Sequence, residues 1–203
     1  MSHINELIQQ FCPGGVEFKA LGELTSIRRG KRLVKSQLDA SGEFPVFQNS
    51  LTPLGYYHES NVQGGTAFVI AAGAAGEIGY SPSDFWAADD VYVATDTANL
   101  EQKYLYHILL MKKGTLSGQV RRASIPRLSK SAIERLEIPV PPLEVQREIV
   151  RVLDQFTQLE TELETELEAR RKQYEYYRDQ LLTFNSLTDA ERERERERSG
   201  GSR

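Results

Sequence analysis

Apolar residues recur with a seven-residue period along the segment 143–184, and this pattern is the clearest structural signal in the chain. The segment contains no Gly and no Pro, follows the pair Pro141-Pro142, and precedes Asn185, a residue typical of helix ends. At 1.5 Å per residue, one helix of this length spans about 60 Å. Because a small domain cannot cover such a helix along its whole length, the pattern predicts a spacer or a helix that pairs with another helix.

The heptads assign the candidate pairing residues and their orientation. Counting Leu153 as position a, a parallel pair would place Glu160 against Glu160 and Arg170 against Arg170, whereas an antiparallel pair centred near Thr165 places Glu160 against Arg170. We therefore expect an antiparallel coiled coil, with a second copy of this chain as a candidate partner. The alternative is an amphipathic helix packed on its own domain. The predicted seam comprises Ile149, Leu153, Phe156, Glu160, Leu163, Leu167, Arg170, Tyr174, Tyr177 and Leu181, and then Phe184.

A short repeat lies within this seam. The sequence Leu-Glu-Thr-Glu occurs at residues 159–162 and again at 163–166. Each unit adds about 6 Å of helix. A change in the number of units would therefore move whatever the helix carries by one or two base-pair rises of DNA, each about 3.4 Å. Leu-Glu repeats are also ordinary in coiled coils, so the repeat alone is a weak signal.

Residues 1–142 read as a globular domain of the α+β class, with short strands separated by Gly turns and followed by helices. Thr66–Ala71 is the strongest core strand, and Gly73–Gly76 is expected to form a tight turn after it. Phe44–Phe47 is expected at a sheet edge, because Pro45 has no backbone donor.

Two helices are expected in this domain. The pattern predicts a short amphipathic helix over residues 4–11 and a longer one over Leu100–Lys113. In the longer helix, Tyr104, Ile108 and Met111 fall on one face. The charged tail from 185 to 203 alternates Glu and Arg before a Gly/Ser stretch, and we expect it to be disordered.

Charge is distributed unevenly over the 203 residues, whose formal net charge is −4. Residues 1–142 hold fourteen Lys or Arg and fourteen Asp or Glu, whereas residues 143–184 hold six basic and ten acidic residues. The globular part therefore remains compatible with an anionic partner. A single cysteine (Cys12), no signal peptide and no apolar run of transmembrane length predict a soluble, cytoplasmic protein.

Two acid-free basic runs are candidate phosphate contacts, and between them lie Gln48 and Asn49, whose amides match the adenine edge in the major groove. A solvated face, with turn chemistry for the amides, is the alternative. The candidate DNA-binding residues are Arg28, Arg29, Lys31, Arg32 and Lys35 in the first run, Gln48 and Asn49, and Lys112, Lys113, Arg121, Arg122, Arg127 and Lys130 in the second run.

No catalytic set emerges from the sequence. There is no P-loop, and the histidines lack metal-ligand spacing. Asp84, Asp89 and Asp90 are candidates for a carboxylate cluster on a metal, with a solvated turn as the alternative. We therefore expect no active site, no metal and no cofactor in this chain.

Several stretches resemble the specificity (S) subunit of type I restriction–modification systems. The most specific is Pro139-Val140-Pro141-Pro142-Leu143-Glu144-Val145-Gln146 before the long helix. The other stretches are Cys12–Lys19 with Leu21–Glu23, Arg28–Lys31, Gly73–Tyr80 and Ser124–Ser129, so that the resemblance covers about residues 4–184.

The resemblance implies a function for each part. Residues 1–142 would be a target recognition domain that reads a half-site in double-stranded DNA, and residues 143–184 would be a spacer and dimerisation helix. The helix would also dock modification subunits, which methylate adenine with S-adenosylmethionine, and a restriction subunit using ATP and Mg²⁺ would join that complex. This chain would supply no catalytic residue.

The sequence departs from the family pattern in one respect. Family members usually carry two recognition domains and two helices, whereas this chain has one of each. It resembles a half-subunit whose homodimer would read a split palindrome, or alternatively a fragment of a longer subunit. A coiled-coil adaptor that binds only protein, and an enzyme with an unrecognised site, are the competing interpretations.

Overall fold

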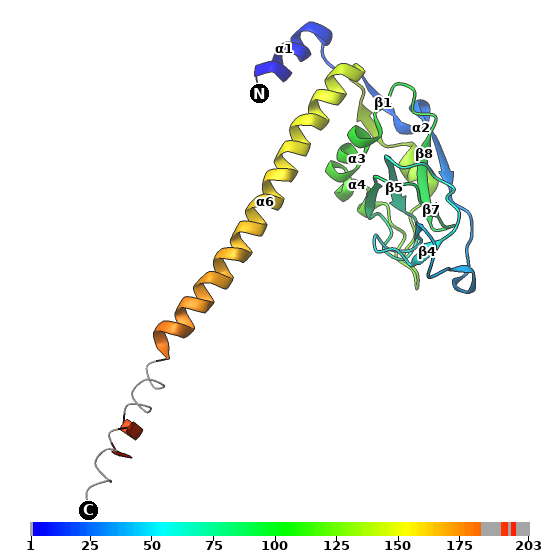
Figure 1. Cartoon of the computed structure of the whole chain (residues 1–203). Helices are drawn as coiled ribbons and strands as arrows, with labels where there is room; N and C mark the ends of the chain where they lie inside the picture. Colours follow the sequence, from blue (N-terminus) through cyan, green and yellow to red (C-terminus); the bar gives the residue numbers. More distant parts are fainter. Residues whose placement is uncertain (1, 184–191, 195, 198–203) are drawn as a thin grey trace, which may run out of the picture. The chain divides into compact units, whose positions relative to one another are not determined.

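The computed structural model of the chain describes residues 2–183, 192–194 and 196–197 (Figure 1). Its internal contacts divide the chain into two units, Met1–Val152 and Leu153–Arg203. Most of the tail for which disorder was predicted lies outside the described residues, while residues 192–194 and 196–197 have helical backbone.

The first unit mixes helices and strands, and the predicted α+β class is confirmed. Its elements are α1 (Ser2–Phe11), β1 (Phe18–Ala20), α2 (Leu21–Leu24), β2 (Ser26–Arg29), the 3₁₀ turn η1 (Lys35–Gln37), β3 (Phe44–Phe47), β4 (Gly55–Tyr57), β5 (Thr66–Ile70), β6 (Ile78–Ser81), β7 (Trp86–Ala87), β8 (Val91–Thr95), α3 (Gln102–Met111), α4 (Lys113–Gly118), α5 (Lys130–Glu134) and β9 (Glu137–Pro139). The long helix α6 (Leu143–Leu182) begins in this unit and continues through the second.

The strands form a four-stranded antiparallel sheet in the order β2-β8-β5-β6, a three-stranded sheet β4-β3-β7 and the pair β1-β9. Strand β5 is buried at every position because both faces of its sheet are covered. Side chains alternate across a strand, so Ala67 and Val69 pack with α3 and α5, while Phe68 and Ile70 face the opposite cluster. The predicted core strand is therefore confirmed, and it is buried on both sides.

The second cluster is built on three aromatic rings. Phe47 from β3 lies 4.7 Å from Phe68 and 5.5 Å from Phe85 between ring centroids, and Phe68 lies 5.3 Å from Phe85. Gly79 on β6 makes room for this packing, because a Cβ there would lie 2.2 Å from the Phe68 ring. The three-stranded sheet is thus joined to the four-stranded sheet through aromatic contacts.

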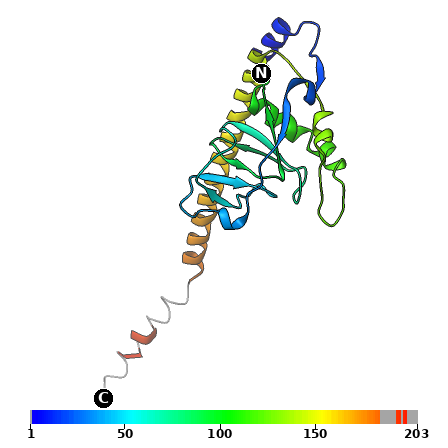
Figure 2. The same ribbon diagram turned by 90° about the vertical axis from the view of Figure 1, so that its right-hand side faces the viewer.

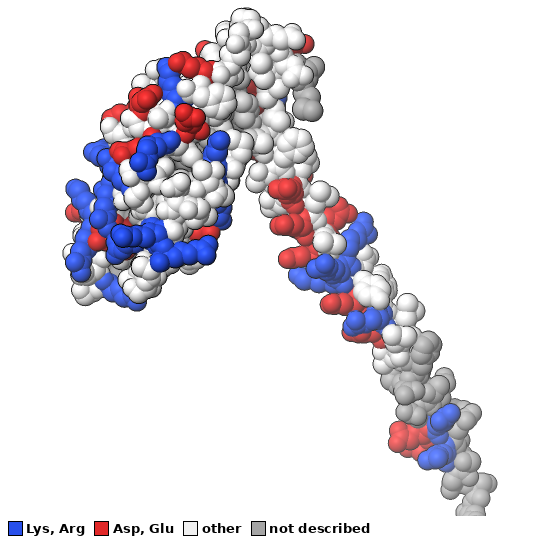
Figure 3. All heavy atoms as spheres, turned by 180° about the vertical axis from the view of Figure 1, so that it is seen from behind, with Lys and Arg blue, Asp and Glu red and all other residues white. Residues whose placement is uncertain are grey.

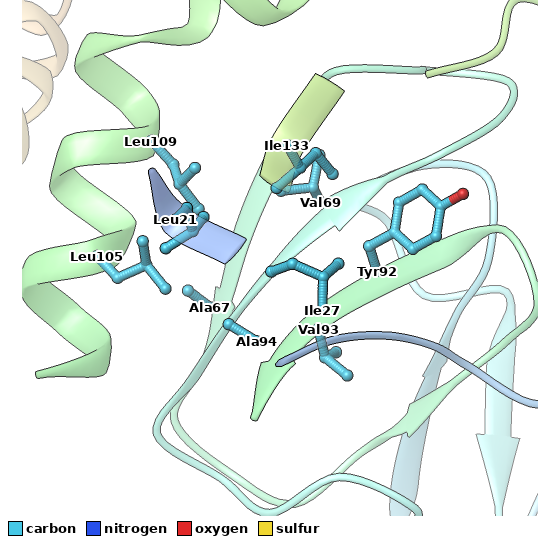
Figure 4. Close-up of a pocket in the computed structure, with 10 residues that line it drawn as sticks. All are labelled: Leu21, Ile27, Ala67, Val69, Tyr92, Val93, Ala94, Leu105, Leu109 and Ile133. Atoms are coloured by element: carbon cyan, nitrogen blue, oxygen red, sulfur yellow. The ribbon is translucent and has the colours of Figure 1, made fainter. Parts of the chain in front are cut away.

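The first cluster encloses one small cavity, lined by ten residues of β2, β5, β8, α2, α3 and α5 (Figure 4). The cavity measures about 10 Å³. That volume is at the lower limit for a single water molecule, and the lining is mainly aliphatic. The cavity is therefore a packing defect of the core, and the functional surface lies elsewhere.

One sequence expectation is wrong. Strand β3 is the central strand of its sheet, whereas an edge position was expected. Its proline is tolerated because the parallel neighbour β7 pairs only with Val46 and Phe47 and begins opposite Val46, beyond Pro45. The buried face of α3 is formed by Tyr104, Leu105, Ile108 and Leu109, and Met111 at the end of the helix is 65% exposed. The predicted helix at residues 4–11 and the long Gly- and Pro-free helix are confirmed.

A buried glutamine fixes the start of α6. The side chain of Gln146 is fully buried; its Oε1 accepts a hydrogen bond from the backbone N–H of Glu101 at 2.9 Å, and its Nε2 donates to the carbonyls of Asn99 at 3.0 Å and Pro141 at 2.8 Å. Glu101 is itself the N-cap of α3, because its carboxylate accepts from the N–H groups of Lys103 and Tyr104 at 2.8 Å each. One amide therefore joins the first turn of α6 to the start of α3.

Tyr104 makes a second contact at this junction. Its hydroxyl donates to the carbonyl of Pro139 at 3.1 Å. Burial raises the pKa of Tyr104 to about 12, so the hydroxyl keeps its proton at neutral pH and remains a donor. Strand β9, which precedes α6, is thereby held against α3.

We expect Gln146→Leu to lower the free energy of unfolding by about 2–4 kcal/mol, because it removes three hydrogen bonds and leaves buried backbone groups unpaired. The measurement is urea unfolding followed by circular dichroism. Gln158→Leu is the matched control, since Gln158 lies on the exposed part of α6 and bonds only to the exposed Glu162 at 2.9 Å. The control should change stability by no more than about 0.5 kcal/mol. Equal effects of the two substitutions would contradict this role for Gln146.

Candidate nucleic-acid interface

Three loops that are distant in sequence meet at one end of the first unit. They follow β3, β5 and α4. The N–H of Gly73 donates to the carbonyl of Pro126 at 3.2 Å, and the N–H of Ala74 donates to the carbonyl of Asn49 at 2.9 Å. The loop after β5 therefore connects the Gln48–Asn49 segment to the arginine-rich connection between α4 and α5.

Gly73 is required at this meeting point. Its φ is +82°, and a Cβ there would lie 2.8 Å from the carbonyl oxygen and 2.9 Å from the Cβ of Asn49. Gly76, with φ of +90°, closes the same loop by donating to the carbonyl of Ile70 at 2.9 Å. The predicted turn at Gly73–Gly76 is thus confirmed, and it also positions the neighbouring loop.

The connection between α4 and α5 is a closed hairpin. The N–H of Arg121 donates to the carbonyl of Arg127 at 2.8 Å, and the N–H of Arg127 donates to the carbonyl of Arg121 at 3.1 Å. Its base is fixed because Leu128 is buried in the core and its N–H donates to the carbonyl of Ala71 at 2.8 Å. Figure 2 shows this connection projecting from the rest of the unit as a yellow-green loop.

The two basic runs meet at the base of this hairpin. Arg29 from β2 lines an open hollow of about 430 Å³ together with Arg121 and Arg127. Tyr92, Gln119 and Ser129 contribute further polar groups to the same hollow. Three guanidinium groups, five donors each and permanently charged, suit this hollow to oxyanions such as phosphate. Lys and Arg side chains gather on the face of the first unit that Figure 3 shows.

The remaining residues of the first run lie outside this hollow. Arg28 donates from Nε to the hydroxyl of Thr95 at 3.1 Å, and the guanidinium of Arg29 also faces Asp90 at 3.5 Å. Gly30 allows the chain to cross the β7–β8 turn, because a Cβ there would lie 2.3 Å from two carbonyl oxygens. Beyond it Lys31, Arg32 and Lys35 are exposed.

Several lysines of the second run are engaged in ion pairs. Lys113 contacts Glu77 at 2.8 Å and Lys130 contacts Glu134 at 2.9 Å, while Lys112 lines a separate hollow with Arg135 and Glu137. Glu77 is 36 residues from Lys113 and could not be paired with it from sequence alone, whereas Glu134 follows Lys130 at the i+4 spacing of a helix. By contrast, Arg121, Arg122 and Arg127 are exposed, and the described part of the chain offers no carboxylate within salt-bridge distance of them.

The amides occupy different environments. Asn49 is exposed and belongs to the loop joined to Ala74, whereas Gln48 is half-buried. The structure therefore brings Asn49 towards the arginine hairpin and leaves Gln48 less accessible. The assignment of base contacts to these amides stays a prediction.

The acidic residues do not converge on a metal. Asp84 accepts a hydrogen bond from the N–H of Gly64 at 2.7 Å, and Asp90 faces Arg29. Among the residues that the structure describes, no group of three or more His, Cys, Asp or Glu could hold a metal ion. Cys12 is a buried free thiol. In the same described residues, no helix has both the length and the apolar character needed to cross a membrane.

The second unit presents the predicted seam to solvent. The exposed fractions of Phe156, Leu163, Leu167, Tyr174, Tyr177 and Leu181 run from 51% to 67%. Glu160 and Arg170 are also exposed, and Arg170 faces Glu166 of its own helix at 3.5 Å. An uncovered row of large apolar side chains is typical of a helix that pairs with another surface.

Two members of the predicted seam differ from the rest. Ile149 is partly buried against the core of the first unit, so its side chain already has an intramolecular contact. Leu153 is only partly exposed. The fully exposed apolar row therefore starts at Phe156.

Comparison with known proteins agrees with this architecture. Residues 13–170 match the family model described as a type I restriction modification DNA specificity domain. A putative type I restriction enzyme specificity subunit of Haemophilus influenzae is 36% identical over 192 residues, which cover 85% of this chain and 47% of that protein. The chain thus spans about half the length of the first curated relatives it matches.

Two further comparisons give a relative of which this chain covers a larger share and a solved structure with the same fold. A putative type I specificity subunit of Mycoplasma pneumoniae is 28% identical over 171 residues, and the match covers 80% of this chain and 71% of that protein. The crystal structure of a type I restriction–modification S subunit from M. genitalium superposes with a TM-score of 0.65 at 20% identity, covering 85% of this chain and 47% of the other. The second similarity shows the same fold.

The glycine at the meeting point of the three loops gives a direct test of this surface. We expect Gly73→Ala to lower the free energy of unfolding by about 1–3 kcal/mol, because an alanine would be strained at this φ and would collide with Asn49. Gly114→Ala is the matched control: Gly114 lies in α4 with nothing within 4 Å of a Cβ, so alanine should stabilise by up to about 1 kcal/mol. Denaturant unfolding of both variants measures the difference, and a neutral Gly73→Ala would contradict the loop geometry described here.

Proposed function

The chain belongs to the type I restriction–modification DNA specificity family, and from this premise we propose that it is a non-catalytic subunit that reads a half-site in double-stranded DNA. The observation that carries the proposal is the hollow in which Arg29, Arg121 and Arg127 come together beside the exposed Arg122. Arg121, Arg122 and Arg127, which have no carboxylate partner among the described residues, suit phosphate contacts, and the exposed amide of Asn49 suits a base edge.

The catalytic reactions would be carried out by partner subunits. We propose that the chain docks modification subunits that use S-adenosylmethionine to methylate adenine, and that a restriction subunit using ATP and Mg²⁺ joins them. The chain itself would bind no cofactor and would direct these subunits to a DNA sequence. Such a complex would work in the cytoplasm, where the DNA of a cell without a nucleus lies.

The long helix would fix the distance between two recognition units. We propose that the exposed row from Phe156 to Leu181 pairs with a second copy of α6 in antiparallel orientation, which would set Glu160 of each copy against Arg170 of the other. The dimer would have two-fold symmetry and would read a palindrome split by an unspecified gap.

Selection from a randomised duplex pool tests DNA reading. We expect the full chain, co-expressed with the modification subunit of its system, to enrich one sequence. On that duplex, Arg121→Ala or Arg122→Ala should reduce the slope of log Kd against log salt by about 0.9, the value of one phosphate contact. Arg171→Ala, an exposed arginine of the second unit, is the matched control and should leave the slope unchanged. Enrichment of no sequence would favour a coiled-coil adaptor instead.

Charge reversal tests the antiparallel seam. We expect E160R to weaken self-association about tenfold or more, because it places like charges together twice in the dimer. R170E alone should act in the same way, and the double variant E160R/R170E should restore the dimer because the opposite charges face each other again. Light scattering over a concentration series measures the mass. Monomers at every concentration, including for the unsubstituted chain, would exclude homodimerisation through α6.

A further inference from the structure

The tip of the arginine hairpin carries an apolar side chain that nothing else in the fold uses. Ile125 is 51% exposed, and its neighbours Arg122, Ala123 and Ser124 are exposed as well. An isolated exposed isoleucine is ordinary on a protein surface. Here, however, it belongs to the loop of residues 122–126, whose two sides are joined by the mutual hydrogen bonds of Arg121 and Arg127 and which projects from the unit in Figure 2.

The charge around this tip indicates which kind of partner the loop would bind. No acid occurs between Gln102 and Ile133; Arg122 lies in the same loop as Ile125, and Arg121 and Arg127 form the base of that loop. A polyanion is attracted to such a loop, and duplex DNA presents both a charged backbone and, in its major groove, the C5-methyl groups of thymine. An apolar tip among arginines is therefore complementary to the groove of DNA in both charge and polarity.

The dimensions of the hairpin agree with this partner. From Arg127 to Ile125 the chain spans two residues, which is at most about 7 Å of backbone, and the isoleucine side chain extends beyond it. The major groove of B-form DNA is about 8.5 Å deep. Arginines at the base of the hairpin can therefore meet the phosphates at the rim of the groove while the tip reaches the base edges on its floor.

The hairpin is also held in place before any ligand binds. Leu128 is buried at one end, and the carbonyl of Pro126, next to Ile125, accepts from the N–H of Gly73 at 3.2 Å. Proline further restricts the backbone at the tip. Because a fixed loop loses little conformational entropy on binding, a small contact at its tip can contribute to discrimination.

We propose that Ile125 is a specificity-determining residue that contacts the C5-methyl group of a thymine in the major groove, while Arg121, Arg127 and Arg29 hold the adjacent backbone phosphates. The inference rests on the proposed function, since it names how the same surface distinguishes one base pair. It assigns an A·T pair to one position of the half-site. The hydrogen-bonding groups of the other positions would come from the remaining loops.

Removal of single methyl groups tests this contact. The probe is the duplex enriched by the full chain with its modification subunit, remade with each thymine in turn replaced by deoxyuridine, which lacks only the methyl group. We expect one replacement to weaken binding about fourfold, the value of one buried methyl group. I125A should weaken binding to the thymine duplex and should be insensitive to that same replacement. Ile8→Ala, an exposed isoleucine on α1, is the matched control and should keep the full sensitivity.

Each other outcome has a defined meaning. If the unsubstituted chain enriches a sequence but I125A remains as sensitive to deoxyuridine as the original, the contact assigned to Ile125 is wrong and DNA reading stands. The assignment is also overturned if the enriched sequence contains no A·T pairs. It is overturned as well if I125A loses binding affinity equally for all duplexes. If the unsubstituted chain enriches no sequence, the proposed function and this inference both fail. If the midpoint of thermal unfolding of I125A equals that of the unsubstituted chain, misfolding is excluded as the cause of weaker DNA binding.

Discussion

The buried amide of Gln146 is the contact on which the attachment of the first turn of α6 to α3 depends. All three of its partners are backbone groups, at Asn99, Glu101 and Pro141, so the contact does not depend on which side chains occupy those positions. A side chain without an amide at this position would leave at least one of these backbone groups unpaired inside the protein, at a cost of about 1–3 kcal/mol for each group left unsatisfied. The first turn of α6 is thereby locked to the N-cap of α3. The helix then runs to Leu182 without a Gly or Pro at which it could bend.

The side chains that stabilise the four-stranded sheet are separate from the exposed side chains of the loops. Both of its faces are occupied, one by α3 and α5 and the other by the aromatic cluster of Phe47, Phe68 and Phe85. Stability therefore comes from side chains that never reach the surface. The loops after β3, β5 and α4 meet through backbone hydrogen bonds at Gly73 and Ala74, so their exposed side chains are free to differ without changing the packing beneath.

Local sequence patterns predicted the elements that depend on local causes. The long helix follows from an uninterrupted heptad, and β5 follows from a run of apolar residues. The central position of β3 was missed because it depends on a parallel neighbour, β7, which is only two residues long and lies 40 residues away. The pairing of Lys113 with Glu77 was missed for a similar reason, since its partner lies on another loop. For the candidate site, sequence identified the arginines, but only the fold joins Arg29 to Arg121.

The four-residue repeat in α6 places a physical limit on any spacing that this helix sets. One Leu-Glu-Thr-Glu unit adds about 6 Å and about 40° beyond a full turn of helix, which corresponds to nearly two base-pair rises of about 3.4 Å. A four-residue insertion interrupts the heptad and locally unwinds a coiled coil. The seam survives because each unit begins with leucine, as Leu159, Leu163 and Leu167 show, so that an added unit replaces one exposed leucine with another. The hydroxyls of Thr161 and Thr165 donate to carbonyls four residues earlier, at 3.0 and 2.9 Å. They therefore need no hydrogen-bond partner from a paired helix. On the proposed function, the gap between half-sites would therefore change in steps set by the helical repeat rather than continuously.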